Sequence, residues 1–108
     1  MKPIVFHPKA REAIRRFPWQ VRDRLGKALY LLQMGESPGM PLSRPMPSVA
    51  RGVSELRIRG DDGQFRVFYV FGDAEAIWVV HAFAKKTRQT PASEIELGRK
   101  RLKEMIHE

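Results

Sequence analysis

The stretch VSELRIRGDDGQFRVFYVF, at residues 53–71, decides the fold because it contains two strand patterns separated by a turn. In its first half, apolar Leu56 and Ile58 alternate with charged residues, which is typical of a strand with one buried face. Residues 65–71 are rich in aromatic and β-branched side chains, which favour strands. The GDDG sequence at residues 60–63 supplies residues suited to a tight turn. The stretch therefore predicts an antiparallel hairpin.

Elements on either side of the hairpin follow from the same periodicities. Short apolar runs predict a strand at residues 4–6 and a strand covered on both faces at residues 77–83. Apolar residues at helical spacing predict helices over residues 8–17, 18–35 and 90–106, where Thr90 is the expected N-cap. Four prolines between residues 36 and 52 predict an extended loop, and Gly72-Asp73 predicts a turn.

The order of these elements is β-α-α-β-β-β-α, which predicts an α+β fold with a small, mainly antiparallel sheet and helices packed on one face. The chain has 108 residues, so we expect one domain, 1–108. The buried side of the last helix is expected to carry Ala92, Ile95, Leu102 and Ile106.

Composition excludes several functional classes. The chain has no cysteine, which excludes disulfide scaffolds, thiolate zinc sites and cysteine nucleophiles. Its histidines, His7, His81 and His107, are too scattered to predict a metal site, and we expect no metal or cofactor. There is no long apolar run and no signal-peptide pattern, so we expect a soluble cytoplasmic protein without a membrane partner.

Charge is the first positive clue to function. The formal net charge is +8, and the excess lies at the two ends: +6 over residues 1–35, −1 over residues 36–83 and +3 over residues 84–108. A small basic domain attracts polyanions through contacts with phosphates. The alternative interpretation is that these charges simply solvate the exposed faces of helices.

Arg66 is the most informative residue of the hairpin, because it lies in mid-strand between large apolar side chains. A buried arginine without a partner is strongly disfavoured. It is therefore either a rigid guanidinium that clamps a phosphate, or an arginine that pairs internally with Glu55 or points outward. Strand alternation places Arg57 and Arg59 on the face opposite Leu56 and Ile58.

The segment from His81 to Thr87 (HAFAKKT) holds a second group of reactive side chains. Histidine is a common acid or base near neutral pH, and lysines stabilise negative charge or, when desolvated, relay protons. The alternative is a core histidine followed by a solvated lysine pair. Such basic groups suffice for metal-free RNA cleavage, in which the 2′-hydroxyl attacks the neighbouring phosphate. Composition alone does not distinguish cleavage from simple nucleic-acid binding.

Two motifs carry a resemblance to a known family. The stretches SELRIR at residues 54–59 and GQFRVFY at residues 63–69 resemble the ELR…G-x-[YF]-R-V-x-Y pattern of RelE/HigB-type toxins. The segment HAFAKKTRQTP at residues 81–91 resembles the HGFxKKTxxTP signature of the phage-derived HigB-like branch of the RelE/ParE superfamily. The helix that begins EIEL at Glu94 is also similar to that branch, and the likeness covers residues 3–106.

The resemblance implies the toxin of a type II toxin–antitoxin module. Such toxins are metal-independent, ribosome-dependent endoribonucleases (mRNA interferases) that cut mRNA and inhibit translation. The implied partners are the ribosome with its mRNA and a cognate antitoxin, a helix-turn-helix HigA-like protein that forms a hetero-oligomer with the toxin. Two alternatives stay open: a non-enzymatic gyrase-poisoning toxin like ParE, and a basic nucleic-acid-binding module without cleavage.

The resemblance also implies the roles of individual residues. Arg66, His81, Lys85 and Lys86 are the candidate catalytic residues, and Arg57, Arg59, Thr87 and Arg88 are the candidate RNA-binding residues. Two departures from the family pattern matter. Ala82 replaces the usual glycine after His81, and the catalytic tyrosine of the archetypal RelE branch has no counterpart here. Tyr69 lies opposite Arg66 by strand parity, so we expect it to pack in the core.

Overall fold

The computed structural model describes residues 1–72 and 76–107. Its elements are β1 (Ile4–Phe6), α1 (Pro8–Arg15), α2 (Trp19–Gln33), β2 (Ser43–Pro45), β3 (Ser54–Gly60), β4 (Gly63–Phe71), β5 (Ile77–Lys85) and α3 (Ala92–Ile106). The strands form a sheet in the order β1-β5-β4-β3-β2, in which β1 and β5 are parallel and the other neighbours antiparallel. The predicted α+β class and mainly antiparallel sheet are confirmed.

The predicted hairpin is β3 and β4, with Gly60 opposite Gly63 so that Asp61 and Asp62 form the turn. Strand alternation gives the hairpin two different faces. Leu56 and Ile58 lie on one face and are buried, whereas Arg57 and Arg59 lie on the other. The predicted turn at Gly72-Asp73 falls partly on residue 73, outside the described residues.

The first two helices form where the sequence predicts them. Proline at the first position of α1 has no N–H to leave unsatisfied, and the ring Nδ1 of His7 accepts a hydrogen bond from the Lys9 backbone N–H at 3.1 Å. After α2, Gly35 has a φ of 83°, a left-handed conformation that glycine adopts without strain. Both helices pack against the sheet through a continuous apolar stripe.

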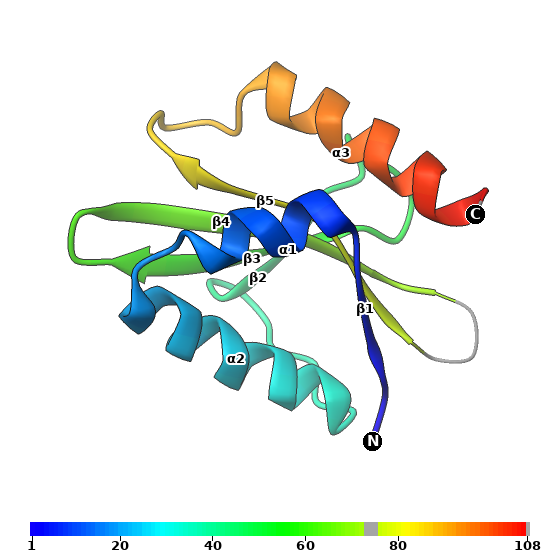
Figure 1. Cartoon of the computed structure of the whole chain (residues 1–108), viewed down its shortest axis with the longest axis horizontal. Helices are drawn as coiled ribbons and strands as arrows, with labels where there is room; N and C mark the ends of the chain where they lie inside the picture. Colours follow the sequence, from blue (N-terminus) through cyan, green and yellow to red (C-terminus); the bar gives the residue numbers. More distant parts are fainter. Residues whose placement is uncertain (73–75, 108) are drawn as a thin grey trace.

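The sheet carries helices on both faces, so the prediction that they pack on one face is wrong. α1 and α2 cover the face that holds Leu56, Val67 and Val79, whereas α3 packs on the opposite face against Phe68 and Val80. Figure 1 shows α2 below the sheet and α3 above it. The physical reason lies in β4 and β5, whose apolar side chains point alternately to both faces and therefore require two covering layers.

Three local predictions are corrected. The proline-rich loop contains the short edge strand β2, which pairs with β3 and which a proline at its end does not disrupt. Thr90 is not the N-cap of α3; its hydroxyl donates to Glu55 instead, and the cap position is Pro91. Ala92 and Ile106 are exposed, whereas Gly98 and Leu102 form the buried side of α3.

None of the three described helices combines the length and apolar character needed to span a lipid bilayer.

Candidate functional site

The candidate site is the part of the α3-side face of the sheet that lies toward the β3–β4 turn. α3 packs over the half of this face that holds Phe68 and His81. Beyond it, strand register brings charged and polar side chains from three strands together. Arg57 lies opposite Arg66, and Gln64 lies between Arg59 and Lys85. Because antiparallel partners point to the same face, these five side chains share one surface.

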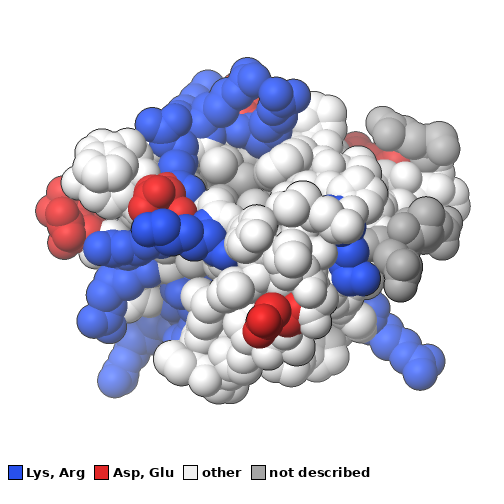
Figure 2. Space-filling model, turned by 90° about the horizontal axis from the view of Figure 1, so that it is seen from below, with Lys and Arg blue, Asp and Glu red and all other residues white. Residues whose placement is uncertain are grey.

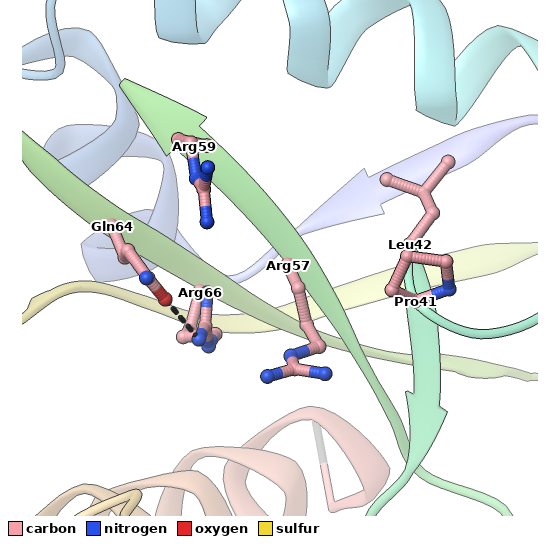
Figure 3. A pocket seen from close by; sticks show the side chains of 6 residues that line it. All are labelled: Pro41, Leu42, Arg57, Arg59, Gln64 and Arg66. Carbon is pink, nitrogen blue, oxygen red and sulfur yellow. Dashed lines mark hydrogen bonds between the residues drawn. The ribbon is translucent and has the colours of Figure 1, made fainter. Parts of the chain in front are cut away.

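A cavity of about 470 Å³ opens on this surface. We call it the site cavity; its lining residues are Pro41, Leu42, Arg57, Arg59, Gln64 and Arg66. Figure 3 shows the three arginine side chains reaching into the same space from β3 and β4, with Gln64 bonded to Arg66. The two apolar residues come from the segment before β2 and close the cavity on one side.

Arg66 is held in place by neighbours on its own sheet. Its side chain is 2% exposed. Its Nη2 donates to Gln64 Oε1 at 2.6 Å, and its Nη1 donates to the Phe65 carbonyl at 3.4 Å. Its Nε lies 3.6 Å from Glu55 Oε1 and has no hydrogen-bond partner. The guanidinium is therefore fixed at the wall of the cavity, and its two hydrogen bonds use fewer than its five N–H donors.

Glu55 supplies the compensating charge from β3, two residues before the position opposite Arg66. Its side chain is 2% exposed, and its second oxygen accepts a hydrogen bond from the Thr90 hydroxyl at 3.0 Å. The internal pair with Arg66, which the sequence left as an alternative to phosphate binding, is thus present together with the cavity. The two interpretations do not exclude each other, because a guanidinium has five N–H donors and Glu55 faces only one side of it.

The site is strongly electropositive. Burial lowers the pKa of Arg66 below its ordinary value; Glu55 opposes this effect, and Arg57 and Arg44 add to it. Burial also lowers the pKa of Lys85, and repulsion from Arg66 lowers it further. Clustered cations disfavour one another's charged forms, so an incoming anion relieves their repulsion. The arrangement is suited to binding phosphate.

None of the four residues from Lys85 to Arg88 is among those that line the site cavity. Lys85 ends the strand, and its Nζ donates to the Arg88 carbonyl at 2.6 Å. The Thr87 hydroxyl donates to the Gln89 carbonyl at 2.6 Å, which makes a compact turn. Lys86, Thr87 and Arg88 are exposed and are not among the residues that line the cavity. They form a basic border beside it.

His81 lies under α3, apart from the arginines. It is 2% exposed and packs against Phe68 and Phe83, with ring centroids 5.6 and 5.2 Å away. Its Nδ1 is 2.5 Å from Arg101 Nη1, and its Nε2 is 2.8 Å from Glu94 Oε1. An arginine only donates, so Nδ1 accepts and Nε2–H donates to the carboxylate. Burial lowers the pKa of His81, which favours this neutral form.

Some residues of the site were not singled out from the sequence. Gln64 is two residues from Arg66 and shares its face, so strand alternation could have identified it. Pro41 and Leu42 gave no signal, because their place at the cavity depends on the pairing of β2 with β3. In the part of the chain that the structure describes, no three His, Asp or Glu side chains form a group suited to a metal ion.

Comparison with known proteins identifies the family. Residues 12–103 match the family described as "Phage derived protein Gp49-like (DUF891)". No curated protein matches this chain. The matched region contains both motifs and every residue that lines the site cavity. Gp49-like proteins are RelE/HigB-like toxins and are often the toxins of toxin–antitoxin modules. The chain therefore belongs to the Gp49-like family of phage-derived proteins.

Proposed function

We propose that this protein is the toxin of a type II toxin–antitoxin module and that it cleaves mRNA on the ribosome without a metal. The observation that carries the proposal is the set of arginines around the site cavity, with Arg66 fixed in its wall. Rigid, partly desolvated cations stabilise charge that develops on a phosphate, because they need little reorganisation when the charge appears.

The proposed reaction is an internal transfer at phosphorus. The 2′-oxygen of the ribose attacks the adjacent phosphorus while a base removes the 2′-hydroxyl proton. The bond from phosphorus to the 5′-oxygen of the next nucleotide breaks, and that oxygen takes up a proton. The products are a 2′,3′-cyclic phosphate and a 5′-hydroxyl, so no water or co-reactant is consumed. The protein has to align the atoms, move protons and stabilise the phosphorane.

We assign these tasks to three groups of residues. Arg66 binds the scissile phosphate, since its fork-shaped guanidinium suits two phosphate oxygens. Lys85 transfers protons or stabilises charge, because its lowered pKa brings it closer to neutrality. Arg57 and Arg59 hold the RNA backbone at the cavity rim, and the exposed residues Lys86, Thr87 and Arg88 contact the RNA beyond it.

His81 is left out of the proton-transfer step in this proposal. Both of its ring nitrogens are bonded to α3 side chains, and its ring is buried among aromatic residues. A general base has to reach the proton that it removes. We therefore assign to His81 the role of holding α3 against the sheet.

The proposed partners follow from the family to which the chain belongs. The ribosome would present the mRNA in the cytoplasm, and a cognate helix-turn-helix antitoxin of the HigA type would neutralise the toxin in a hetero-oligomer. One second function is supported by an observation. Lys85 is not among the residues that line the site cavity, and its Nζ donates to the Arg88 carbonyl, so a protein that binds RNA without cleaving it is the competing proposal.

The test is primer extension on a reporter mRNA after induction of the protein, with translation active and then blocked. We expect discrete cuts that disappear when translation stops. The variants are Lys85→Gln and Arg66→Lys. The Arg66→Lys variant keeps the positive charge beside Glu55 but loses the fork-shaped guanidinium. Arg66→Ala is a poorer choice, because it would leave Glu55 buried without its partner.

A matched control separates the site from general loss of charge. Lys27→Gln removes an exposed lysine from α2 that does not line the site cavity, so the cuts should persist. Growth arrest with intact mRNA would instead favour gyrase poisoning, which a supercoiling assay checks. RNA binding without any cleavage would favour the plain binding module.

A further inference from the structure

A second hollow adjoins the site cavity, between α2 and the outer part of β3. Its volume is about 570 Å³. We call it the α2–β3 groove. Its apolar lining consists of Ala28 and Leu31 from α2, Ile58 from β3 and Leu42 from the segment before β2. Leu31 is 39% exposed, so part of this apolar lining is open to solvent.

Cations surround this apolar lining. Arg24 and Lys27 come from α2, Arg57 and Arg59 come from β3, and no acidic residue lines the groove. Arg24 donates to the Arg59 carbonyl, and it forms no ion pair with an acidic residue in the described part of the chain. Lys27 pairs with Asp23 at 3.0 Å, but both side chains are at least half exposed, so water screens the pair. Figure 2, seen from the side of α2, shows Lys and Arg gathered along one flank of a broad surface with few charges.

The lining distinguishes between two kinds of anionic partner. Bases of single-stranded RNA bind by stacking chiefly on aromatic side chains, and none of the described aromatic residues lines this groove, whose floor is alanine, leucine and isoleucine. An amphipathic peptide helix uses both features at once, since its apolar face fills the floor and its carboxylates meet the rim. We propose that the α2–β3 groove is the docking surface for an acidic amphipathic helix of a partner protein.

This docking would regulate the proposed activity. Leu42, Arg57 and Arg59 line both the α2–β3 groove and the site cavity. A helix whose carboxylates pair with Arg57 and Arg59 would remove these cations from the RNA backbone, and RNA would in turn weaken docking of the helix. The regulatory part of the inference rests on the proposed function, whereas the docking surface does not. Competition of this kind is reciprocal by thermodynamic linkage.

The probe is a fluorescein-labelled synthetic helix of about 20 residues, long enough to be helical in water, with leucines on one face and glutamates on the other. Two control peptides replace its glutamates with lysine or its leucines with serine. Fluorescence anisotropy measures the Kd of each peptide for the full-length protein. We expect the acidic amphipathic peptide to bind and both controls to bind at least about tenfold more weakly.

Substitutions at two adjacent positions of α2 test where the peptide binds. Leu31→Glu places a carboxylate in the groove and should weaken peptide binding about tenfold or more. Tyr30→Glu makes the same charge change one residue away, outside the groove, and should change the Kd less than about threefold. Both residues are exposed, and circular dichroism verifies that both variants fold.

Three results would overturn the docking surface: no binding of the acidic peptide to the wild type, equal losses in the two variants, or a loss of RNA binding in Leu31→Glu as large as the loss of peptide binding. The last result would assign the groove to RNA. mRNA cleavage is scored separately. If the peptide binds but mRNA is not cleaved, the proposed function is wrong and the docking surface stands. If mRNA is cleaved but the peptide does not bind, the docking surface is wrong and the proposed function stands.

Discussion

Replacing Glu55 with glutamine tests how Arg66 is held at the site cavity. The substitution removes the carboxylate beside the guanidinium and preserves both the size of the side chain and an acceptor for Thr90. At the observed separation of 3.6 Å, the attraction between the charges is about 5 kcal/mol for an effective dielectric constant of about 20. Breaking a buried pair by removing one partner typically costs about 3–5 kcal/mol.

We expect the lower end of this range, because the guanidinium keeps its hydrogen bonds to Gln64 and to the Phe65 carbonyl when Glu55 is replaced. Glu55→Gln should therefore lower the free energy of unfolding by about 3 kcal/mol, which corresponds to a fall in Tm of about 13 °C for a domain of this size. Urea unfolding followed by circular dichroism measures the free energy.

Two controls make the measurement specific. Glu96→Gln breaks the exposed ion pair with Arg99 on α3 and should cost less than about 1 kcal/mol. Glu55→Leu combined with Arg66→Met replaces both charges with apolar groups and should restore stability to within about 1 kcal/mol of the wild type. Equal small losses for Glu55→Gln and Glu96→Gln would refute the argument that Arg66 is desolvated and held by its partner.

Three further predictions concern His81, two helix glycines and Lys85. Burial lowers the pKa of His81 in the folded protein, so neutral His81 contributes its full stability above the unfolded pKa of about 6.5, and this contribution is lost as the pH falls below that value. His81→Gln should therefore flatten the slope of the free energy of unfolding against pH in this range by up to about 1.4 kcal/mol per pH unit. Urea unfolding at several pH values measures the slope. Gly98→Ala should lower the free energy of unfolding by about 1 kcal/mol, because its Cβ would lie 2.8 Å from Phe68 Cδ2. In contrast, the Cβ of Gly26→Ala on α2 would meet no atom within 4 Å, so this variant should raise the free energy of unfolding by up to about 1 kcal/mol. Thermal unfolding compares the two variants. If Lys85 is the general base, the single-turnover rate of mRNA cleavage should rise with pH until the pH reaches the lowered pKa of Lys85, and Lys85→Gln should abolish this rise. An unchanged pH profile in Lys85→Gln would show that Lys85 does not transfer the proton.

The sequence predicted the hairpin and its two faces because strand alternation is a local property. Strand alternation placed Arg57 and Arg59 on one face, the family resemblance assigned them and Arg66 to the site, and the structure places all three around one cavity. The prediction that Tyr69 packs in the core is also confirmed, since it is 5% exposed and its hydroxyl lies 2.7 Å from Ser43 Oγ. The faces of Arg57 and Arg59 and the packing of Tyr69 depended only on the parity of positions along a strand.

The errors concern contacts between distant segments. Thr90 matches the pattern of an N-cap, but Glu55, 35 residues away, takes its hydroxyl as a donor. Ile106 lies on an apolar stripe of α3 and is nevertheless 55% exposed. His81 and Arg66 both come from motifs that suggest catalysis, yet α3 covers only the first of them.

The sequence by itself determined which residues form strands and helices, which strand positions share a face, and that the surface attracts anions. Periodicity, turn chemistry and net charge are properties of short segments or of the whole composition, so they need no knowledge of the fold. The tertiary structure alone decided that α3 covers His81 and leaves Arg66 at an open cavity, and that Leu42 joins this cavity to the α2–β3 groove. Where a helix ends on a sheet, and which loop residues border it, depends on the packing of apolar faces across long distances in the chain.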